Sequence, residues 1–559
     1  MQLPEPRPVP FNTLMASIEN GLIKIPQFQR DFVWSKERVA KLLDSIVKGY
    51  PIGTFIFWKT KEELRHVRNL GGVILPPTPK GDFVQYVLDG QQRMTSLFAT
   101  LKGLKVKRAD GVEDDFRDIY VDLNATEHEQ VVVTDASGRG EDSIVRLVDL
   151  VGGGLKLLKR FPERLHDRLD NYRNRLLAYQ YSTILVQDAE IDVATEIFTR
   201  LNIGGKPLSV FEIMVAKTYD AGKNFDLAEK YRGLLEDLEP LGYETVSDAT
   251  LLQAISSVLV QECQKRHILS LKKADVIAAW DEVEDAFKHA IEHIRNSYHV
   301  PVSKLLPYNA LLVPFTYFFF KHRKKPVGNT HRYLQDFFWR TSLSGRYSSG
   351  VEGKIAQDLK RIDDILAGKA PAYDYPVDIT KPFIKSNGLF SAGRSYIKAI
   401  LCIYASKQPK SFSNNAVIRI SNDWLKQANS KNYHHFFPKG FMDKERTNVP
   451  YERVNHVLNI TIVDDYLNKR EIRAQAPSKY MKRFSKGNDE LEQTMKTHLI
   501  DLNTFGIWDD DFERFFDRRA ALVHRELAKR IIPQQTDTAA QQVKLDDYEE
   551  EAPVEEQES

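Results

Sequence analysis

The first 125 residues alternate between short apolar runs and stretches whose apolar residues recur at helical spacing. The runs at 23–26, 54–58, 84–88 and 118–123 predict β-strands. After Ser35, a plausible N-cap, one helical face repeats until Gly49 ends the helix; its apolar residues are Val39, Leu42, Leu43 and Ile46. A second such face, ended by Gly103, follows the turn at 89–90; it consists of Met94, Leu97, Phe98 and Leu101. The pattern predicts interleaved strands and helices.

From about residue 150 to 400 the pattern becomes mainly helical. Ser209 and Glu212 stand at the spacing of a capping box and predict a helix start. Residues 311–320 form the most apolar run, which is about half the length that a membrane span needs. Because the basic run 321–325 follows directly, we expect a buried helix there and no membrane association.

The C-terminal third changes character twice. Residues 406–432 are polar and indicate an approach to another domain, and 433–532 form a compact unit of mixed character. Beyond Pro533 the chain is polar and then acidic, so residues 533–559 are expected to be a disordered tail. The chain has 559 residues, which at roughly 150 residues per domain suggests about three or four domains.

Composition adds two constraints. The formal net charge is +2, but residues 545–559 hold eight acids and no Lys or Arg, so the charge of the rest is +10. A basic body of this kind is compatible with a polyanionic partner. Two cysteines cannot form a disulfide framework or a cysteine-ligated zinc site, and the N-terminus lacks the pattern of a signal peptide. Both features favour the cytoplasm.

The run YHHFFPK at 433–439 is the densest chemistry in the chain. Adjacent histidines on a strand point to opposite faces, so His434 and His435 need different roles or a bent backbone. Asn459 and Asn468 follow downstream. This spacing resembles the HNH (ββα-metal) nucleases, and PSKY at 477–480 extends the resemblance to the HNH enzymes of modification-dependent restriction. The alternative is two histidines that merely satisfy backbone groups.

The resemblance implies roles for single residues. His435 would be the general base, His434 and Asn468 would bind one divalent metal, and Asn459 would brace the loop that orients His435. Asn468 replaces the commoner third histidine, which favours Mg²⁺ or Mn²⁺ over Zn²⁺. Basic residues near the motif would contact DNA phosphates: Lys439, Lys469, Arg470, Arg473 and Lys479.

Two N-terminal segments, IPQFQRDFVW at 25–34 and DGQQR at 89–93, carry a second candidate site. The DGQQR run lies between a predicted strand and a helix start, where free N–H groups and the helix dipole attract anions. Gly90 would let the backbone approach a phosphate, and Arg93 would bind it bidentately. The structural alternative is a common turn in which Arg93 pairs with Asp89. No P-loop sequence is present.

These two segments, with FTRLNIGGKPLS at 198–209, resemble the N-terminal domain of GmrSD-type restriction proteins, which include SspE-like members. FFWR at 337–340 and RYSS at 346–349 fit the helical extension of that family. The resemblance implies an α+β multidomain protein with a ParB/sulfiredoxin-like α/β core. Its expected parts are a sensor and nucleotide domain (1–225), a helical region (226–405), a ββα-metal HNH domain (406–532) and the tail.

The family also implies ligands. A nucleoside triphosphate (ATP, GTP or CTP) would bind and be hydrolysed at Asp89, Gly90, Gln91, Gln92 and Arg93. Gln29, Arg30 and Trp34 would line the same cavity and take part in sensing modified phage DNA, although Trp34 is equally explained as a core residue. The sequence leaves a homo-oligomer open.

The leading hypothesis is therefore an antiphage endonuclease or nickase that senses modified DNA, needs a divalent metal and is gated by nucleotide. The rival is a nucleotide-switched, ParB-like DNA-binding module with an inactive HNH domain. The retained histidines and asparagines argue against that rival. A sulfiredoxin-like reductase is excluded because residues 84–100 contain no cysteine.

Overall fold

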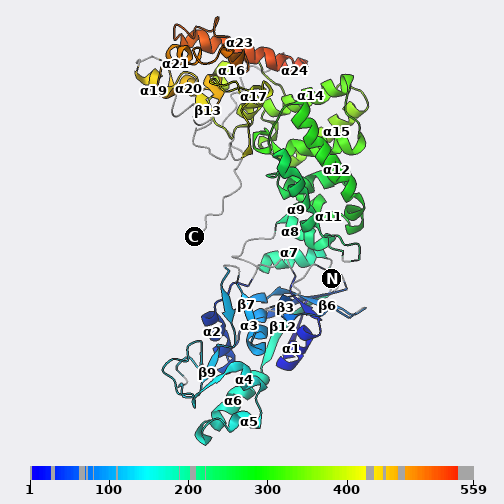
Figure 1. Cartoon of the computed structure of the whole chain (residues 1–559). Helices are drawn as coiled ribbons and strands as arrows, with labels where there is room; N and C mark the ends of the chain where they lie inside the picture. Colours follow the sequence, from blue (N-terminus) through cyan, green and yellow to red (C-terminus); the bar gives the residue numbers. More distant parts are fainter. Residues whose placement is uncertain are drawn as a thin grey trace. The chain divides into compact units, whose positions relative to one another are not determined.

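The computed structural model divides the chain into two compact units, Met1–Leu227 and Ala228–Ser559 (Figure 1). We call them unit 1 and unit 2. The residues that the structure describes are 3–26, 32–61, 64, 69–70, 73–79, 81–108, 111–126, 128–187, 189, 191–201, 209–220, 222–422, 433–444, 449–463 and 472–538.

Unit 1 is built on a five-stranded sheet with the order β1-β12-β3-β6-β2. Its strands are β1 (Glu5–Pro10), β2 (Ile23–Lys24), β3 (Phe55–Thr60), β6 (Val84–Asp89) and β12 (Gln180–Gln187). β2 runs parallel to β6, and β12 runs parallel to β3, whereas β1 with β12 and β3 with β6 are antiparallel. The sheet is therefore mixed.

Side chains of these strands alternate between two hydrophobic clusters, one on each face of the sheet. Phe57 and Val87 face helices of the larger cluster, which are α1 (Phe11–Glu19), α2 (Lys36–Val47), α3 (Gln91–Lys102), α4 (Leu147–Gly152) and α6 (His166–Leu177). Trp58 and Tyr86 face the other way, toward α7 (Ile191–Leu201). Both faces of the sheet are thus covered by packed side chains, and the strands are held in place against the helices.

Short strands and helices complete unit 1. A three-stranded sheet has the order β10-β9-β11, and two hairpins pair β7 with β8 and β4 with β5. The bounds are β4 (Asn69–Leu70), β5 (Val73–Ile74), β7 (Lys105–Lys107), β8 (Glu113–Asp115), β9 (Tyr120–Asp122), β10 (Val132–Val133), β11 (Ile144–Arg146), α5 (Leu155–Leu158) and η1 (Glu163–Leu165). α8 (Val210–Thr218) begins at Ser209, whose side chain forms the predicted capping box with Glu212.

The strands predicted at 23–26, 54–58, 84–88 and 118–123 correspond to β2, β3, β6 and β9, and the two predicted helices correspond to α2 and α3. Gly103 ends α3 in the left-handed conformation, as a glycine after a helix commonly does. The mixed α+β character is confirmed, whereas the ParB-like and HNH assignments remain predictions.

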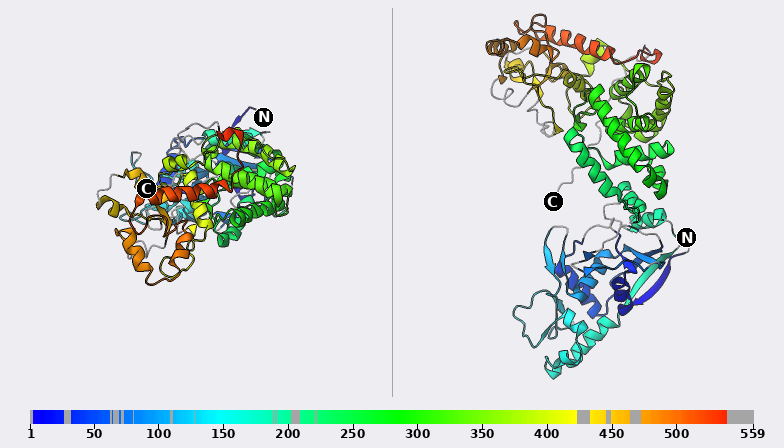
Figure 2. Two further views of the ribbon diagram at one scale, coloured as in Figure 1. Left: turned by 90° about the horizontal axis from the view of Figure 1, so that it is seen from above. Right: turned by 45° about the vertical axis from the view of Figure 1, so that its right-hand side comes forward.

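Unit 2 begins with a helical region around the apolar helix α13 (Leu312–Lys321). α13 is buried from Leu312 to Phe319 and packs against α10, α12 and α15. The bounds are α9 (Leu227–Leu238), η2 (Glu239–Leu241), α10 (Asp248–Val260), α11 (Lys265–Ser270), α12 (Lys273–Ser297), η3 (Ser303–Leu305), η4 (Asn309–Leu311), α14 (Gly328–Leu343), η5 (Arg346–Ser348), α15 (Val351–Leu366), α16 (Lys381–Asn387) and α17 (Ser395–Ser406). The run at 311–320 is thus the buried helix that its pattern predicted. α12, with 25 residues, extends along this region (Figure 2).

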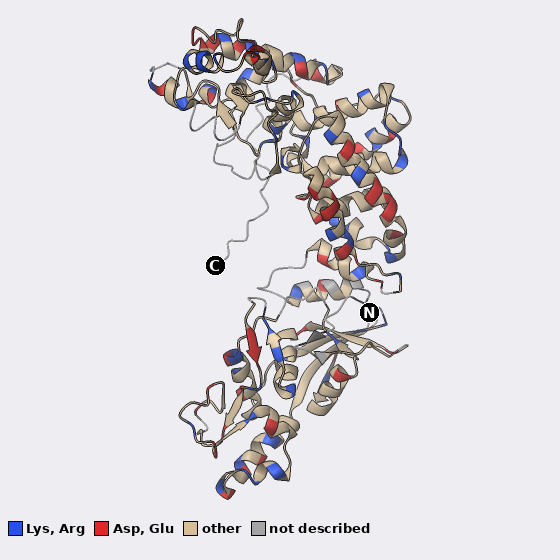
Figure 3. Cartoon of the chain, viewed as in Figure 1, with Lys and Arg blue, Asp and Glu red and all other residues tan. Residues whose placement is uncertain are grey.

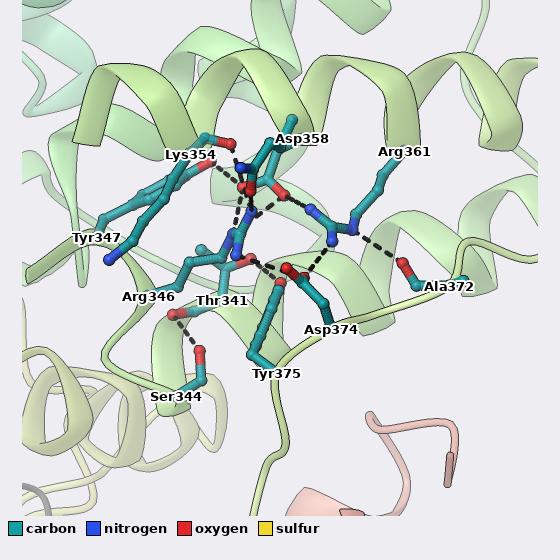
Figure 4. Close-up of polar contacts among 11 residues, drawn as sticks. Thr341, Ser344, Arg346, Tyr347, Lys354, Asp358, Arg361, Ala372, Asp374 and Tyr375 are labelled. Atoms are coloured by element: carbon teal, nitrogen blue, oxygen red, sulfur yellow. Dashed lines mark hydrogen bonds and ion pairs between the residues drawn. The ribbon is translucent and has the colours of Figure 1, made fainter. Parts of the chain in front are cut away.

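The predicted RYSS segment supplies a buried ionic network in this helical region (Figure 4). Arg346 Nε donates to both carboxylate oxygens of Asp358, at 2.8 and 3.1 Å, and the Tyr347 hydroxyl donates to the same carboxylate at 2.7 Å. Arg361 reaches Asp358 at 2.6 Å and also pairs with Asp374. These residues therefore join η5, α15 and the segment after it.

The C-terminal part of unit 2 contains a small hairpin and short helices. Its elements are β13 (Tyr433–His435), α19 (Lys439–Lys444), α20 (Tyr451–Val454), η6 (Val457–Asn459), β14 (Ile460–Ile462), α21 (Pro477–Phe484), α22 (Leu491–Lys496), α23 (Phe512–Ala528) and α24 (Gln535–Thr538). No described helix is long and apolar enough to cross a membrane.

The ordered contacts continue past residue 532, where the acidic tail was expected to begin. Arg340, which is fully buried, donates to both carboxylate oxygens of Asp537 in α24, at 2.5 and 3.0 Å, and to the carbonyl of Ile532 at 2.8 Å. Asp537 also accepts the N–H of Val377 at 3.0 Å. Residues 533–538 thus contact the helical region, and the acidic residues at 545–559 lie outside the described residues.

Candidate functional site

The two N-terminal motifs meet at one edge of the unit 1 sheet. β2 and β6 are parallel neighbours, so their carboxyl ends lie at the same edge, the usual position of ligand sites in α/β proteins. β6 leads into the DGQQR loop, and β2 leads into residues 27–31, which contain Gln29 and Arg30 and lie outside the described residues. The side-chain oxygen of Gln92 accepts the N–H of Val33 at 2.9 Å. The loop is therefore tied to the chain just after Gln29 and Arg30.

Arg93 is held by three acceptors within the protein. Its guanidinium donates to the carbonyls of Ile52 and Thr54, at 2.8 and 3.0 Å, and to the Asp89 carboxylate at 3.0 Å. It also lies 5.2 Å from the ring centroid of Phe55. The Arg93 side chain is only 17% exposed. The sequence left open that Arg93 pairs with Asp89 and not with a phosphate, and this ion pair is present.

Gly90 is required by the geometry of this corner. It caps α3 with a φ of 92°, which L side chains rarely adopt, and a Cβ there would stand 2.5 Å from the Phe55 ring. The N–H groups of the first turn of α3 have no acceptors within the helix, and such groups can bind an anion. Asp89, with a side chain 40% exposed, and the half-buried Gln91 stand beside that turn.

Trp34 packs at the edge of the unit 1 core. Its ring is partly buried against the larger hydrophobic cluster of unit 1. The guanidinium of Arg38 lies 4.4 Å from the ring centroid. Trp34 therefore has a packing role, and its predicted role in sensing DNA stays a prediction.

In unit 2, His434 and His435 occupy the short strand β13, opposite Thr461 and Ile460 of β14. His434 is only 2% exposed, and its ring lies edge-on to Tyr480 with the centroids 6.1 Å apart. His435 is half-buried, and its Nε2 lies 2.9 Å from the side-chain oxygen of Asn455. The strand thus gives the two histidines separate partners, as expected from their adjacent positions.

Burial lowers the pKa of His435 from 6.5 to about 4. The hydrogen bond with Asn455 opposes this shift, and the charge of Lys439 adds to it. The imidazole is therefore neutral near pH 7. When its Nε2–H donates to Asn455, the lone pair of Nδ1 remains to accept a proton.

Asn459 braces the turn that follows His435. Its side-chain oxygen accepts the N–H of Phe437 at 2.8 Å, and its side-chain nitrogen donates to the carbonyls of Phe437 and Val454 at 3.0 and 2.9 Å. Its own carbonyl accepts the N–H of Phe436 at 2.7 Å. Asn459 is completely buried, so these bonds fix the backbone between the two strands. The role that the resemblance implies for Asn459 in orienting His435 stays a prediction.

α23 supports this turn from behind. The Phe436 ring stacks on Phe515 with centroids 5.0 Å apart and an angle of 11°. Arg519, fully buried, donates to the carbonyl of Leu458 at 2.8 Å and to that of His498 at 3.1 Å. Burial lowers the pKa of Arg519. Burying a guanidinium costs free energy of folding, and the hydrogen bonds to the two carbonyl oxygens offset part of that cost.

The proposed phosphate contacts are placed only in part. Lys439 is half-buried, with its Nζ 3.4 Å from the hydroxyl of Tyr451, a residue that is 60% exposed. Arg473 and Lys479 are exposed. Asn468, Lys469 and Arg470 lie outside the described residues.

Of the two residues expected to bind a metal, the structure describes His434, and Asn468 lies outside the described residues. Among the described residues, no group of three His, Cys, Asp or Glu stands close enough to hold a metal ion. One imidazole and one amide oxygen would leave the remaining positions to water and substrate oxygens, a donor set that suits a hard cation. Metal binding is therefore a prediction.

Sequence inspection did not identify Asn455 or Arg519 as parts of this site, and it gave Tyr480 of the PSKY motif no role. Asn455 lies 20 residues from His435, and Arg519 lies 61 residues from Leu458. The Tyr480 hydroxyl donates to the Phe436 carbonyl, beside His435. A weak signal for Asn455 was its position four residues before Asn459 in the run NHVLN.

Comparison with known proteins gives a family match for the N-terminal part of the chain and a similarity to one further protein along most of its length. Residues 11–219 match the family described as the N-terminal domain of the GmrSD restriction endonuclease. The match lies within unit 1 and contains the DGQQR loop. An uncharacterized protein of Methanocaldococcus jannaschii, MJ0686, is 23% identical over 594 residues, covering 93% of this chain and 98% of that protein. The second similarity therefore extends through both units.

Proposed function

We propose that this chain is a restriction-type antiphage enzyme that senses modified DNA and cuts or nicks it at the C-terminal site. The proposal rests on the match of residues 11–219 to the GmrSD restriction endonuclease N-terminal domain and on the surroundings of His435. The observation that carries it is a neutral, half-buried imidazole with one nitrogen fixed by Asn455 and its turn braced by Asn459.

In the proposed reaction, His435 acts as the general base. Its Nδ1 takes a proton from water as the water oxygen attacks the phosphorus atom; the bond to the leaving oxygen breaks, and that oxygen takes a proton from solvent water. Because the pKa of His435 is about 4, the base form is present at any pH above about 5. Asn455 and Asn459 keep the imidazole in one orientation, which saves the entropy of positioning it.

A divalent cation such as Mg²⁺ or Mn²⁺, held by His434 and Asn468, would stabilise the charge that develops on the phosphate. Lys439, Lys469, Arg470, Arg473 and Lys479 would bind the DNA backbone around it.

The nucleotide is proposed to act through unit 1. A nucleoside triphosphate would place its phosphates at the first turn of α3, with Gly90 allowing close approach. Arg93 is already bound to Asp89, so phosphate binding would compete for or add to that ion pair. Binding or hydrolysis would then shift the protein between states of different cleavage activity.

The test is plasmid cleavage by the purified full-length protein with Mg²⁺ or Mn²⁺, on modified and unmodified phage DNA, with and without each nucleoside triphosphate. We expect metal-dependent nicking or cutting that His435→Ala lowers by about 10³-fold, within the range known for loss of a general base. His524→Ala is a matched control, because His524 lies on α23 and its Nδ1 bonds the carbonyl of Ile379, away from His435 in the sequence.

DNA binding without cleavage under every metal and nucleotide condition would favour the alternative, a nucleotide-switched binding module. Equal cleavage by His435→Ala and the wild type would exclude His435 as the base. Nucleotide gating has its own readout: Arg93→Ala should change nucleotide turnover, and unchanged turnover and cleavage in that variant would exclude the gating role.

A further inference from the structure

α21 presents a row of basic side chains on the face opposite its buried one. Pro477, Tyr480, Met481 and Phe484 are buried. The exposed side chains are Lys479, Lys482 and Arg483 of α21 and Lys486, which lies two residues beyond the end of the helix at Phe484. This row, which we call the α21 stripe, appears as blue ribbon at one end of unit 2 (Figure 3).

The lysines of the α21 stripe, Lys479, Lys482 and Lys486, form no ion pairs within the part of the chain that the structure describes. By contrast, Lys496 on the neighbouring helix α22 lies 3.4 Å from Glu492. Asp510, at the start of α21, accepts the backbone N–H of Ser478 at 2.8 Å and its hydroxyl at 2.6 Å.

α21 is also fixed to the strand that carries the candidate base. The Tyr480 hydroxyl donates to the carbonyl of Phe436, the residue after His435, and the Tyr480 ring contacts His434. Tyr480 follows Lys479 directly, so the start of the stripe is held in a set position relative to the two histidines. The basic row is therefore part of the same rigid element as the site.

We infer that the α21 stripe binds the phosphate backbone of the DNA strand beside the cleavage site. Within α21, Lys479 and Arg483 are four residues apart, about 6 Å at 1.5 Å per residue, which spans about two nucleotides at 3.4 Å per step. Lys486 continues the row beyond the end of the helix, so the positive charges of the row match those of successive phosphates. The inference rests on the proposed function for its substrate, and it adds a binding surface that sets how DNA is held.

A structural role is the competing explanation for two of these residues. Lys482 and Arg483 lie in the last turn of α21, where positive charge stabilises the helix dipole by about 0.3–1 kcal/mol. That explanation does not apply to Lys479 in the first turn, where positive charge is unfavourable. It also predicts a loss of thermal stability, and not of DNA affinity, when the charges are removed.

The experiment measures DNA binding by the full-length protein in the His435→Ala background, so that no substrate is cut. The test variant is Lys479→Gln/Lys482→Gln/Lys486→Gln, assayed with a short duplex between 50 and 300 mM salt. We expect affinity to fall about tenfold or more at low salt, and the slope of log affinity against log salt to fall by about 2 to 3. The triple Arg variant, which keeps the charges, should bind like the parent.

A matched control removes three charges from exposed lysines of the helical region: Lys324→Gln/Lys325→Gln/Lys369→Gln. An equal loss of affinity in this control, or unchanged binding by the α21 variant, would overturn the inference. Thermal unfolding of each variant separates loss of binding from loss of folding. If the wild type cuts no DNA while binding still depends on the α21 stripe, the proposed function fails and only the binding of the DNA backbone by the stripe stands.

Discussion

The corner around Arg93 in unit 1 and the corner around His435 in unit 2 use their polar atoms differently. Arg93 donates to Ile52, Thr54 and Asp89, so most of its hydrogen-bonding capacity is used by the fold. His435 has one ring nitrogen held by Asn455. The difference is that the guanidinium of Arg93 is bound on several sides within the fold, whereas the hydrogen bond with Asn455 holds the imidazole of His435 at one nitrogen.

Each of these two regions also depends on one buried residue. Gly90 is fixed by its positive φ and the nearby Phe55 ring, and Asn459 is fixed by its bonds to Phe437 and Val454. In unit 1 the determinant is steric, and in unit 2 it is hydrogen bonding. Mutation and pH should therefore affect the two corners unequally.

Acidification is the strongest way to separate the two units. Burial lowers the pKa of four histidines of unit 2 to about 4 or about 3; they are His293, His435, His456 and His498. The unfolded chain, with histidine pKa values near 6.5, binds protons more readily, so stability is lost as pH falls from about 6.5 toward 4. The lowered pKa of His435 alone corresponds to a loss of on the order of 3 kcal/mol in the free energy of unfolding over this pH range. We expect unit 2 to unfold before unit 1, measured by hydrogen exchange of peptides from each unit.

The measurement needs a matched variant because acid also titrates carboxylates. His498→Phe should weaken the acid sensitivity of unit 2 and leave that of unit 1 unchanged. Simultaneous loss of protection in both units at every pH would contradict the prediction.

Asn459→Ala should have the next largest effect. It leaves the N–H and carbonyl of Phe437 without their buried partner, and each such loss costs about 1–3 kcal/mol. We expect cleavage to fall by at least about 100-fold, measured as the initial rate of plasmid nicking at equal amounts of folded protein.

Asn422→Ala is the control for this loss. Asn422 is also buried, and it bonds Gly242, Glu244 and Ser303 in the helical region. A similar fall in cleavage for both variants would mean that the brace at Asn459 has no specific effect on His435.

Arg93 gives a smaller effect in the other corner. Arg93→Ala and Arg93→Lys both lose the geometry that reaches three acceptors, so we expect unit 1 to lose about 2 kcal/mol. Denaturant-dependent hydrogen exchange in unit 1 measures this loss. The exposed Arg146→Ala serves as a control. Full stability of Arg93→Lys would show that charge alone is sufficient and would remove the contrast with His435.

Deletion of 545–559 should have the smallest effect. The eight acids of this segment can compete with DNA for basic surface, so their removal should raise non-specific DNA affinity by a few-fold at low salt. The gain should disappear in high salt. Unchanged affinity at low salt would mean that these acids do not compete for the DNA-binding surface.

Local patterns predicted much of the fold but few of the contacts at the sites. The spacing of Val39, Leu42 and Ile46 was sufficient to predict α2, because a helix buries one face. Arg93 was identified, yet its acceptors at Ile52 and Thr54 lie about 40 residues away and leave no local signal. Arg340 and Asp537 are 197 residues apart, so the polar stretch around Asp537 resembled a tail although its carboxylate is bound to a buried arginine.

The dependence of the His435 turn on α23 has a consequence for protein synthesis. Phe515 and Arg519 must be present before Phe436 and Leu458 find their partners. At about 5–20 residues per second, a ribosome needs several seconds to advance from β14 to α23. During that interval the histidines have left the peptidyl-transferase centre, but their supporting helix has not been made. Nascent chains and fragments that end before α23 should therefore lack the fixed backbone turn that holds His435.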